Sequence, residues 1–319
     1  MRVLVTEPIH EKGIALLREH FEVVEGNTHD WDVIRDLAAD CDGILVRTVK
    51  ICREIISSAP KLKCIAVHGV GVDYVDIVAA TERGIPVVNA PFSNSNAVAE
   101  YCLGAMLALL RQTASSDREV RTGDYAALRA AIQLGELRGK TVGLIGLGRI
   151  AQCIVPLLAP FKVRLLAYDP FAAPETFEKN NAERCETITD LLSIADIVTI
   201  HVPLTKATRD LISAETIKIM KPGSYIINAA RGGIVNEEAV VDAIESGRLA
   251  GAAFDVFVTE PPQKDSPLLR CDKIILSPHS AALTAEARRN MAVQAAENLI
   301  AVLKGQQPTS CVNKDALGR

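Results

Sequence analysis

The sequence predicts an α/β protein built from two doubly wound parallel sheets. Short apolar runs rich in Val, Ile and Leu alternate with helical patterns along most of its 319 residues, which is typical of parallel sheets with helices on both faces. A glycine-rich G-x-G-x-x-A motif follows one of the central apolar runs, but no apolar run within the first hundred residues is followed by such a motif. Together with the length, this difference indicates two domains with different tasks.

The first predicted domain covers about residues 1–98. Its predicted strands and helices alternate: Val3–Val5, Glu11–His20, Phe21–Val24, Trp31–Ala39, Gly43–Val46, Arg53–Ser58, Leu62–Val67, Ile77–Arg83 and Ile85–Val88. Because ligands of such sheets bind beyond the carboxyl ends of the strands, His68–Asp73 and Arg47 are candidate binding residues. The glycines of this segment either expose backbone N–H groups to a carboxylate or form a turn that only starts the next helix.

The helix predicted at residues 97–110 is apolar on nearly every side, so it should be buried and lead into the second domain. Asn96 is its candidate cap. The segment Thr122–Leu137, with two glycines, is predicted to be a surface loop.

The glycine motif has the features of a dinucleotide-binding turn. Thr141–Ile145 reads as a buried strand, and Gly146, Gly148 and Ala151 follow it. Gly146 allows a sharp turn, Gly148 admits a pyrophosphate, and Ala151 keeps the next helix close to the sheet. A second strand, Val163–Tyr168, ends at Asp169, roughly 20 residues on, where a ribose-binding acid is expected.

The remaining chain continues the alternation. We predict strands at Ile197–Ile200, Tyr225–Asn228, Ala252–Phe254 and Ile274–Ser277, helices at Thr208–Met220, Glu237–Ser246 and Thr284–Lys304, and a loop at Pro170–Glu186. Four polar residues follow strand ends of this domain: Arg231, Asp255, Glu260 and His279. An arginine grips a carboxylate through two hydrogen bonds, and a histidine paired with a carboxylate exchanges protons near neutral pH.

With these residues the chain resembles the D-isomer-specific 2-hydroxyacid dehydrogenase family, most of all the 3-phosphoglycerate dehydrogenases and their relatives. The matching segments are Val67–Asp73, Asn89–Pro91, Ala97–Glu100, Thr141–Gln152, His201–Ile212, Gly223–Val235, Gly251–Phe257 and Ser277–His279. Formate dehydrogenases of this family have a glutamine at the position of Glu260, which argues against that activity. His68 stands where relatives often have a small or amide residue, so the shape of the substrate pocket stays open.

The resemblance implies roles for individual residues. Arg231 binds the substrate carboxylate and carbonyl, His279 is the general acid/base, and Glu260 is its partner. The backbone of Val70 and Gly71 binds the substrate carboxylate. From their positions rather than from the resemblance, Arg47 and Lys50 are candidates for binding a phosphate or another anion further out, which keeps a phosphorylated substrate among the expectations. The cofactor is NAD, and its implied contacts are Gly146, Gly148, Arg149, Ile150, Asp169, His201, Val202, Pro203, Thr208, Ala229, Ala230 and Asp255.

The same resemblance implies the domain layout and the assembly. Residues 1–98 and 284–319 form a flavodoxin-like substrate domain, and 99–283 form an inserted Rossmann domain. The expected protein is a homodimer built mainly through the nucleotide domain, around the helix at 97–110 and the loop after it. The expected reaction is NAD-dependent oxidation of a small D-2-hydroxy acid such as 3-phosphoglycerate, or the reduction of hydroxypyruvate or glyoxylate. Since the chain stops at Arg319, we expect no C-terminal regulatory domain. An alternative is an NADH-sensing, corepressor-like binding protein.

Composition excludes other classes. The net charge of −4 offers no electrostatic footprint for nucleic acid or an acidic membrane, and no apolar run reaches membrane-spanning length. The eight cysteines form no C-x-x-C pair, so neither a metal site nor a disulfide framework is expected. Since a strand directly follows Met1, no signal peptide is expected, and the cytoplasm is the predicted location.

Overall fold

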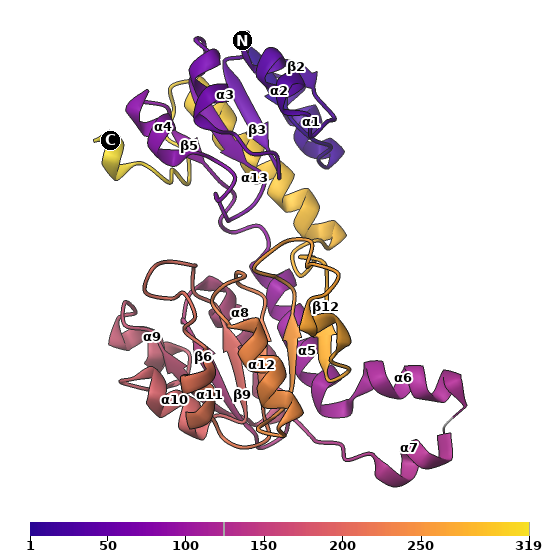
Figure 1. The fold of residues 1–319 in the computed structure, drawn as a ribbon. Coiled ribbons are helices and arrows are strands. Elements are labelled where there is room, and N and C mark those ends of the chain that lie inside the picture. Colours follow the sequence, from indigo (N-terminus) through magenta and orange to yellow (C-terminus); the bar gives the residue numbers. More distant parts are fainter. Residues whose placement is uncertain (124, 319) are drawn as a thin grey trace. The chain divides into compact units, whose positions relative to one another are not determined.

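The computed structural model of the chain describes residues 1–123 and 125–318. They form two compact units (Figure 1): unit 1 contains Met1–Asn94 and Ala282–Arg319, and unit 2 contains Ser95–Ala281. Each unit is an α/β body with its own parallel sheet, so the predicted fold class is confirmed.

Unit 1 contains a five-stranded sheet in the order β2-β1-β3-β4-β5, which is the flavodoxin-like order. Its strands are β1 (Arg2–Val5), β2 (Glu22–Glu25), β3 (Gly43–Val46), β4 (Cys64–Val67) and β5 (Val87–Val88). Its helices are α1 (Glu11–Arg18), α2 (Trp31–Ala38), α3 (Arg53–Ser58), α4 (Ile77–Glu82), α13 (Ala285–Leu303) and the short η3 (Asp315–Leu317).

Two apolar clusters sandwich this sheet, because successive strand residues point to opposite faces. Val3, Leu45 and Ala66 pack with α1 and α13 on one face. Leu4 and Ile65 pack with α2, α3 and α4 on the other. The helix predicted near the C-terminus therefore supplies part of the core of the first sheet.

Unit 2 contains a seven-stranded parallel sheet in the order β12-β11-β10-β9-β6-β7-β8. The strands are β6 (Thr141–Ile145), β7 (Arg164–Tyr168), β8 (Glu183–Arg184), β9 (Ile197–Ile200), β10 (Ser224–Asn228), β11 (Leu249–Phe254) and β12 (Ile274–Leu276). The strand order reverses between β6 and β9, which are neighbours in the sheet. In open α/β sheets such a switch point is where ligands bind.

The helices of unit 2 are α5 (Ser95–Arg111), α6 (Thr113–Thr122), α7 (Tyr125–Ala131), α8 (Arg149–Leu158), η1 (Ala159–Phe161), α9 (Pro174–Lys179), α10 (Ile188–Ile194), α11 (Ala214–Ile219), α12 (Glu237–Glu245) and η2 (Pro267–Arg270). The apolar helix α5 packs against α8, β10 and β11. Beyond α5, α6 and α7 extend away from the rest of the unit (Figure 1).

Three predicted segments differ from the structure, and the candidate cap Asn96 lies inside α5, which begins at Ser95. The predicted loop at 122–137 contains helix α7, whose alanine-rich sequence favours a helix. The predicted loop Pro170–Glu186 contains α9 and β8. Pro174 is the first residue of α9, a position where proline is favoured. The side chain of Phe177, which is 3% exposed, anchors this helix in the core.

The predicted helix Thr208–Met220 begins only at Ala214. Ile212 pairs in an isolated bridge with Val235, so the chain is still extended there. Ser213 and Thr216 then form a reciprocal capping box that starts α11.

Within the described ranges, no helix is both long and apolar enough to cross a membrane. The same residues contain no cluster of three His, Cys, Asp or Glu side chains suited to a metal ion.

Candidate active site

The imidazole of His279 is paired with a carboxylate just beyond β12. Its Nδ1 lies 2.8 Å from Oε2 of Glu260, and the two side chains are 43% and 34% exposed. Oε1 of Glu260 accepts a hydrogen bond from the backbone N–H of Phe257 at 3.1 Å. Because an ionised carboxylate only accepts hydrogen bonds, the pair places a ring hydrogen on Nδ1. Nε2 is then the atom left to exchange a proton.

Asp255 holds the segment that carries His279. Its carboxylate accepts hydrogen bonds from Ser277 Oγ at 2.5 Å, from Ser280 N at 2.8 Å and from Ala281 N at 2.9 Å. Its carbonyl oxygen accepts the His279 N–H at 2.8 Å. Asp255 is 1% exposed, so in this structure it acts through the backbone on both sides of His279. Its predicted contact with the cofactor stays a prediction.

A tyrosine extends this network into α5. The Tyr101 hydroxyl lies 2.7 Å from Ser277 Oγ, and burial raises the pKa of Tyr101 to about 12. His279 has φ of +50°, a left-handed conformation that is uncommon outside glycine. The hydrogen bonds of Asp255 around this residue hold it there.

The loop after β10 carries Arg231. The side chain of Asn228, 1% exposed, accepts the Ala230 N–H at 3.1 Å and donates to the Arg231 carbonyl at 2.9 Å. Arg231 Nη1 donates to the Ala230 carbonyl at 2.6 Å. One buried amide therefore fixes the backbone from which the guanidinium projects.

The turn after β6 has the geometry that a dinucleotide needs. Gly146 has φ of +89°, and an added Cβ would lie 2.8 Å from Val202 and 2.9 Å from the His201 carbonyl. Gly148 is the N-cap of α8 and brings no side-chain hydrogen bond. A Cβ added there would meet nothing within 4 Å. The space above this helix N-terminus is therefore open to an anion.

Asp169 follows β7 at the predicted ribose position. Its Oδ1 accepts hydrogen bonds from the backbone N–H groups of Phe171 at 2.9 Å and Ala172 at 3.2 Å, and Oδ2 accepts that of Leu147 at 2.8 Å. A carboxylate has about four lone-pair sites, so one site on Oδ2 remains for a ligand hydroxyl. The residues of unit 2 thus fit a nicotinamide dinucleotide.

The other predicted cofactor residues of unit 2 lie at strand ends of the same sheet. Arg149 and Ile150 start α8, His201–Pro203 follow β9, and Ala229 and Ala230 follow β10. Thr208 Oγ1 donates to the Pro203 carbonyl at 2.6 Å, which closes the loop after β9. Burial of the ring lowers the pKa of His201 to about 3, and its Nε2 lies 3.0 Å from Thr199 Oγ1.

In unit 1, Val70 and Gly71 follow β4. The Val70 carbonyl accepts a hydrogen bond from Asn89 Nδ2 at 2.7 Å, which anchors the loop. Among the residues that the structure describes, no acceptor is found for the backbone N–H of Val70 or Gly71. These two N–H groups are available to a carboxylate.

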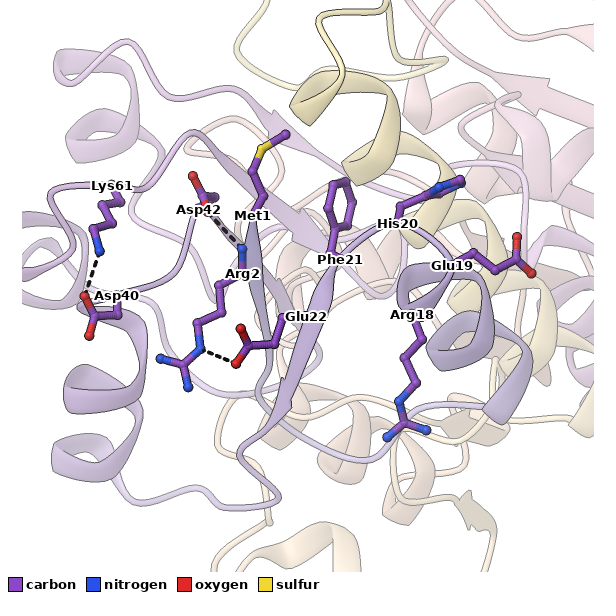
Figure 2. A pocket seen from close by; sticks show the side chains of 10 residues that line it. All are labelled: Met1, Arg2, Arg18, Glu19, His20, Phe21, Glu22, Asp40, Asp42 and Lys61. Atoms are coloured by element: carbon purple, nitrogen blue, oxygen red, sulfur yellow. Dashed lines mark hydrogen bonds and ion pairs between the residues drawn. The ribbon is translucent and has the colours of Figure 1, made fainter.

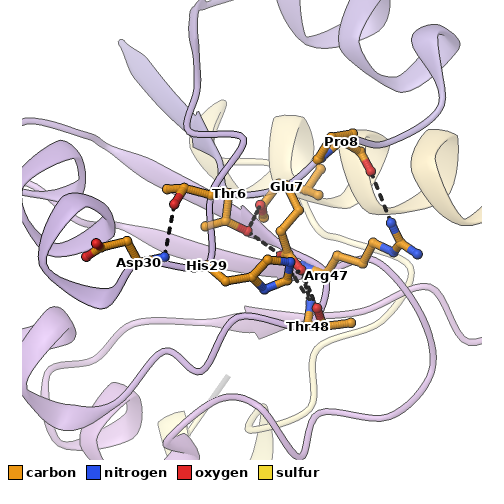
Figure 3. A network of polar contacts seen from close by, with 9 residues as sticks. Thr6, Glu7, Pro8, His29, Asp30, Arg47 and Thr48 are labelled. Atoms are coloured by element: carbon orange, nitrogen blue, oxygen red, sulfur yellow. Dashed lines mark hydrogen bonds and ion pairs between the residues drawn. The ribbon is translucent and has the colours of Figure 1, made fainter.

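Arg47 follows the neighbouring strand β3, and Glu7 holds its backbone (Figure 3). The carboxylate of Glu7 accepts hydrogen bonds from Arg47 N at 2.9 Å and from Thr48 N at 2.8 Å, and it also contacts the hydroxyls of Thr6 and Thr48. Glu7 is 2% exposed. Burial alone raises the pKa of Glu7, but these hydrogen bonds outweigh it and leave the pKa lowered.

His68 stands beside Arg47 because Val67 pairs with Val46 on the adjacent strand. It is 7% exposed, and its Nε2 is buried without a hydrogen-bond partner. Burial, and next the charge of Arg47, lower the pKa of His68 to about 4. His68 is therefore a neutral, buried ring next to a candidate substrate residue.

A pocket of about 710 Å³ lies elsewhere on unit 1 (Figure 2). Its lining includes Arg2 and Glu22, which start β1 and β2, and Asp42 and Lys61, which precede β3 and β4. This is the amino edge of the sheet, opposite to Arg47 and Val70. Its charges neutralise one another, as in the Arg2–Glu22 and Lys61–Asp40 pairs.

Three residues whose hydrogen bonds hold the site together have no predicted role: Glu7, Tyr101 and Ser277. One signal was available for Glu7, an acid directly after an apolar strand. The contacts of Tyr101 with Ser277 join residues 176 positions apart, and no local pattern reports them.

Unit 2 thus has the fold of a nicotinamide-dependent oxidoreductase, with an open glycine turn after β6 and a histidine–carboxylate pair beyond β12. Residues 103–281 match the family model described as D-isomer specific 2-hydroxyacid dehydrogenase, NAD binding domain. The chain belongs to this family, as the resemblance predicted.

Relatives cover the whole chain. It is 42% identical to a glyoxylate reductase of Thermofilum pendens, across 99% of this chain and 95% of the relative. It is 40% identical to a D-3-phosphoglycerate dehydrogenase of Methanocaldococcus jannaschii, across 98% of this chain but only 59% of the relative. Among solved structures, an NADPH-dependent glyoxylate/hydroxypyruvate reductase of Sinorhizobium meliloti is similar, with TM-score 0.87, 30% identity, and coverage of 98% and 96%.

Proposed function

We propose that this chain is an NAD-dependent oxidoreductase that interconverts a small D-2-hydroxy acid and its 2-oxo acid. The observation that carries the proposal is the 2.8 Å pair of His279 and Glu260, in a unit that also has the dinucleotide turn. When bound, NAD supplies the hydride chemistry. The protein residues supply orientation, charge and the proton.

In the reducing direction, protonated His279 donates the Nε2 proton to the substrate carbonyl oxygen, while Glu260 keeps the ring oriented. Arg231 binds the substrate carboxylate and carbonyl and stabilises the negative charge that develops on that oxygen. In the oxidising direction, neutral His279 takes the proton of the C2 hydroxyl at the same nitrogen. One residue thus serves as acid in one direction and base in the other.

For the cofactor, we propose that the pyrophosphate binds at Gly146, Gly148 and the first turn of α8, at Arg149 and Ile150. Asp169 accepts a hydrogen bond from the adenosine ribose. The remaining contacts are proposed for His201, Val202, Pro203, Thr208, Ala229, Ala230 and Asp255.

Residues 99–283 form the nucleotide domain in this proposal, and residues 1–98 and 284–319 form the substrate domain. The free N–H groups of Val70 and Gly71 bind a carboxylate, and Arg47 binds an anionic group of the substrate, with Lys50 as a further candidate. The substrates to test are 3-phosphohydroxypyruvate, hydroxypyruvate and glyoxylate.

The experiment is a panel of these 2-oxo acids assayed with NADH and with NADPH. We expect turnover of at least one compound to the D-hydroxy acid, identified by chiral chromatography. Tight NADH binding without turnover of any compound would contradict the proposal and favour a sensing protein.

We also propose a homodimer in the cytoplasm. Helix α6 has no buried residue, and Val120, Tyr125 and Leu134 are 50%, 56% and 46% exposed. A second copy would cover these apolar side chains of α6, α7 and the segment that follows α7. The free cysteines of the described chain are consistent with a reducing compartment. Light scattering should give twice the mass of the chain, and a monomeric mass would contradict the dimer.

A further inference from the structure

Glu237, the first residue of α12, behaves unlike an ordinary first-turn acid. Such residues usually face solvent and interact with the helix dipole. Asn236 already caps this helix by accepting the Ala239 N–H at 3.0 Å. Glu237 is instead partly buried, and its Oε1 accepts the backbone N–H of Val258 at 2.7 Å. Its neighbour Glu238 is exposed.

The residue that Glu237 binds lies in the loop that carries Glu260. Two successive N–H groups of this loop are held by different carboxylates, Phe257 by Glu260 at 3.1 Å and Val258 by Glu237. The Val258 side chain is 61% exposed, whereas the side chain of Phe257 is 7% exposed. Apolar packing therefore holds the loop at Phe257, and the hydrogen bond to Glu237 holds it at Val258.

The like charges of Glu237 and Glu260 also interact. Burial raises the pKa of Glu237, the like charge of Glu260 raises it further, and the hydrogen bond from Val258 opposes both. The elements packed against α12 carry Glu215 and Lys218 on α11 and Arg270 on η2. Asp210 lies beside the N-cap, where its Oδ1 accepts a hydrogen bond from Asn236 Nδ2 at 3.4 Å. Of the charged groups, Glu260 is the one whose charge raises the pKa of Glu237.

We propose that Glu237 is a positioning residue for the reaction: it fixes the loop of Glu260, and its negative charge favours proton uptake by the Glu260–His279 pair. The inference rests on the proposed oxidoreductase function. Glu237 is not among the residues proposed to bind substrate or cofactor, so its effect reaches the reaction through Glu260.

Two substitutions separate the hydrogen bond from the charge, and a third is the control. Glu237→Gln keeps an oxygen that accepts the Val258 N–H but removes the charge. We expect kcat at the optimum to change only a few-fold, and the midpoint of the alkaline limb of kcat/KM for reduction to move down by about 0.5–1 pH unit. Glu238→Gln makes the same change of net charge on the same helix turn, and we expect an unchanged profile.

Glu237→Ala removes both the acceptor of the Val258 N–H and the negative charge. We expect kcat to fall by about 10–100-fold through misplacement of the pair, while the Kd for NADH, measured by fluorescence, stays unchanged. If the Ala variant does not fold, the Gln variant still decides the question. A Gln profile that superimposes on the wild type would overturn the charge effect, and full activity of a folded Ala variant would overturn the positioning role.

A readout without turnover separates this inference from the proposed function. The NMR titration of the His279 ring in wild type and Glu237→Gln should show the same downward shift of the midpoint, even if no tested 2-oxo acid is reduced. Lack of turnover in the wild type then contradicts the oxidoreductase function, whereas an unshifted His279 titration contradicts the role of Glu237.

Discussion

A Cβ added to Gly232 would lie 1.9 Å from the carbonyl oxygen of Phe257 and 2.6 Å from the nitrogen of Val258. The loop that carries Arg231 therefore touches the loop that leads to Glu260, backbone against backbone. The substrate-binding guanidinium and the partner of the acid/base are proposed to work together, and this contact couples their positions.

Gly232→Ala should consequently damage both loops. The extra methyl group forces the backbones apart, and overpacking of this kind costs typically ~1–3 kcal/mol. We expect a loss of that size in urea unfolding, together with a fall in kcat/KM of at least 10-fold, since roughly 1 Å of misplacement costs up to about 100-fold. Gly104→Ala, where an added Cβ meets nothing within 4 Å, should show neither effect.

His279→Ala tests the acid/base. Removal of a positioned proton donor should lower kcat by about 10²–10⁴-fold, with the Kd for NADH unchanged. Glu260→Gln retains an acceptor for the Phe257 N–H and should keep the loop in place, but it weakens proton uptake by the ring. As the pH is raised, the reducing activity of this variant should therefore decline at a lower pH than that of the wild type. Near-full activity of His279→Ala would contradict the mechanism.

The specificity for NAD should depend on the charge of Asp169. A 2′-phosphate near this carboxylate meets a like charge, worth up to about 4 kcal/mol at 4 Å and an effective dielectric of 20. We expect the wild type to prefer NADH strongly, and Asp169→Asn to reduce the ratio of kcat/KM for NADH over NADPH at least 10-fold. Equal use of both cofactors by the wild type would contradict the role of the charge.

Glu7 should stabilise unit 1 through the backbone of Arg47 and Thr48. Glu7→Ala leaves these buried donors without an acceptor, and a lost charge-assisted hydrogen bond costs roughly 1.5–3 kcal/mol. We expect a loss of at least this size in urea unfolding and a raised KM for an anionic substrate. Glu7→Gln, which keeps one acceptor oxygen, should lose less. Equal losses in both variants would mean that packing, not hydrogen bonding, explains the effect.

Much of this site could be predicted because its residues follow buried strands. Gly146 and Gly148 follow β6, Asp169 follows β7 and His279 follows β12, so apolar runs alone gather them at one sheet edge. The His279–Glu260 pairing was a prediction of the resemblance, and the structure places their atoms 2.8 Å apart.

The features that the sequence did not predict are of two kinds: helices without a periodic pattern of apolar residues, and contacts between segments that are distant in the sequence. Helix α6 buries no residue, so no apolar stripe marks it. The tight approach of Gly232 to Phe257 and the hydrogen bond from Val258 to Glu237 arise only when two loops meet at the sheet edge. An isolated glycine or glutamate in the sequence carries no sign of either.

The last prediction concerns His68 and the dependence of stability on pH. Its pKa is lowered to about 4 in the folded protein, against about 6.5 in an unfolded chain. The unfolded state therefore binds this proton more readily. The contribution of the neutral His68 ring to the free energy of unfolding is therefore complete above pH ~6.5. It is lost as the pH falls toward 4, at about 1.4 kcal/mol per pH unit.

His68→Ala should remove this dependence. The variant loses packing by an amount that does not change with pH, but it also loses the ring that resists protonation. Urea unfolding between pH 4 and 7 should therefore show a smaller fall in the free energy of unfolding for His68→Ala than for the wild type, with a difference in slope of about 1.4 kcal/mol per pH unit. Substitution of the exposed His20 should leave the wild-type slope unchanged. Parallel curves for wild type and His68→Ala would show that folding does not lower the pKa of His68, and the resistance of this ring to protonation beside Arg47 would have to be abandoned.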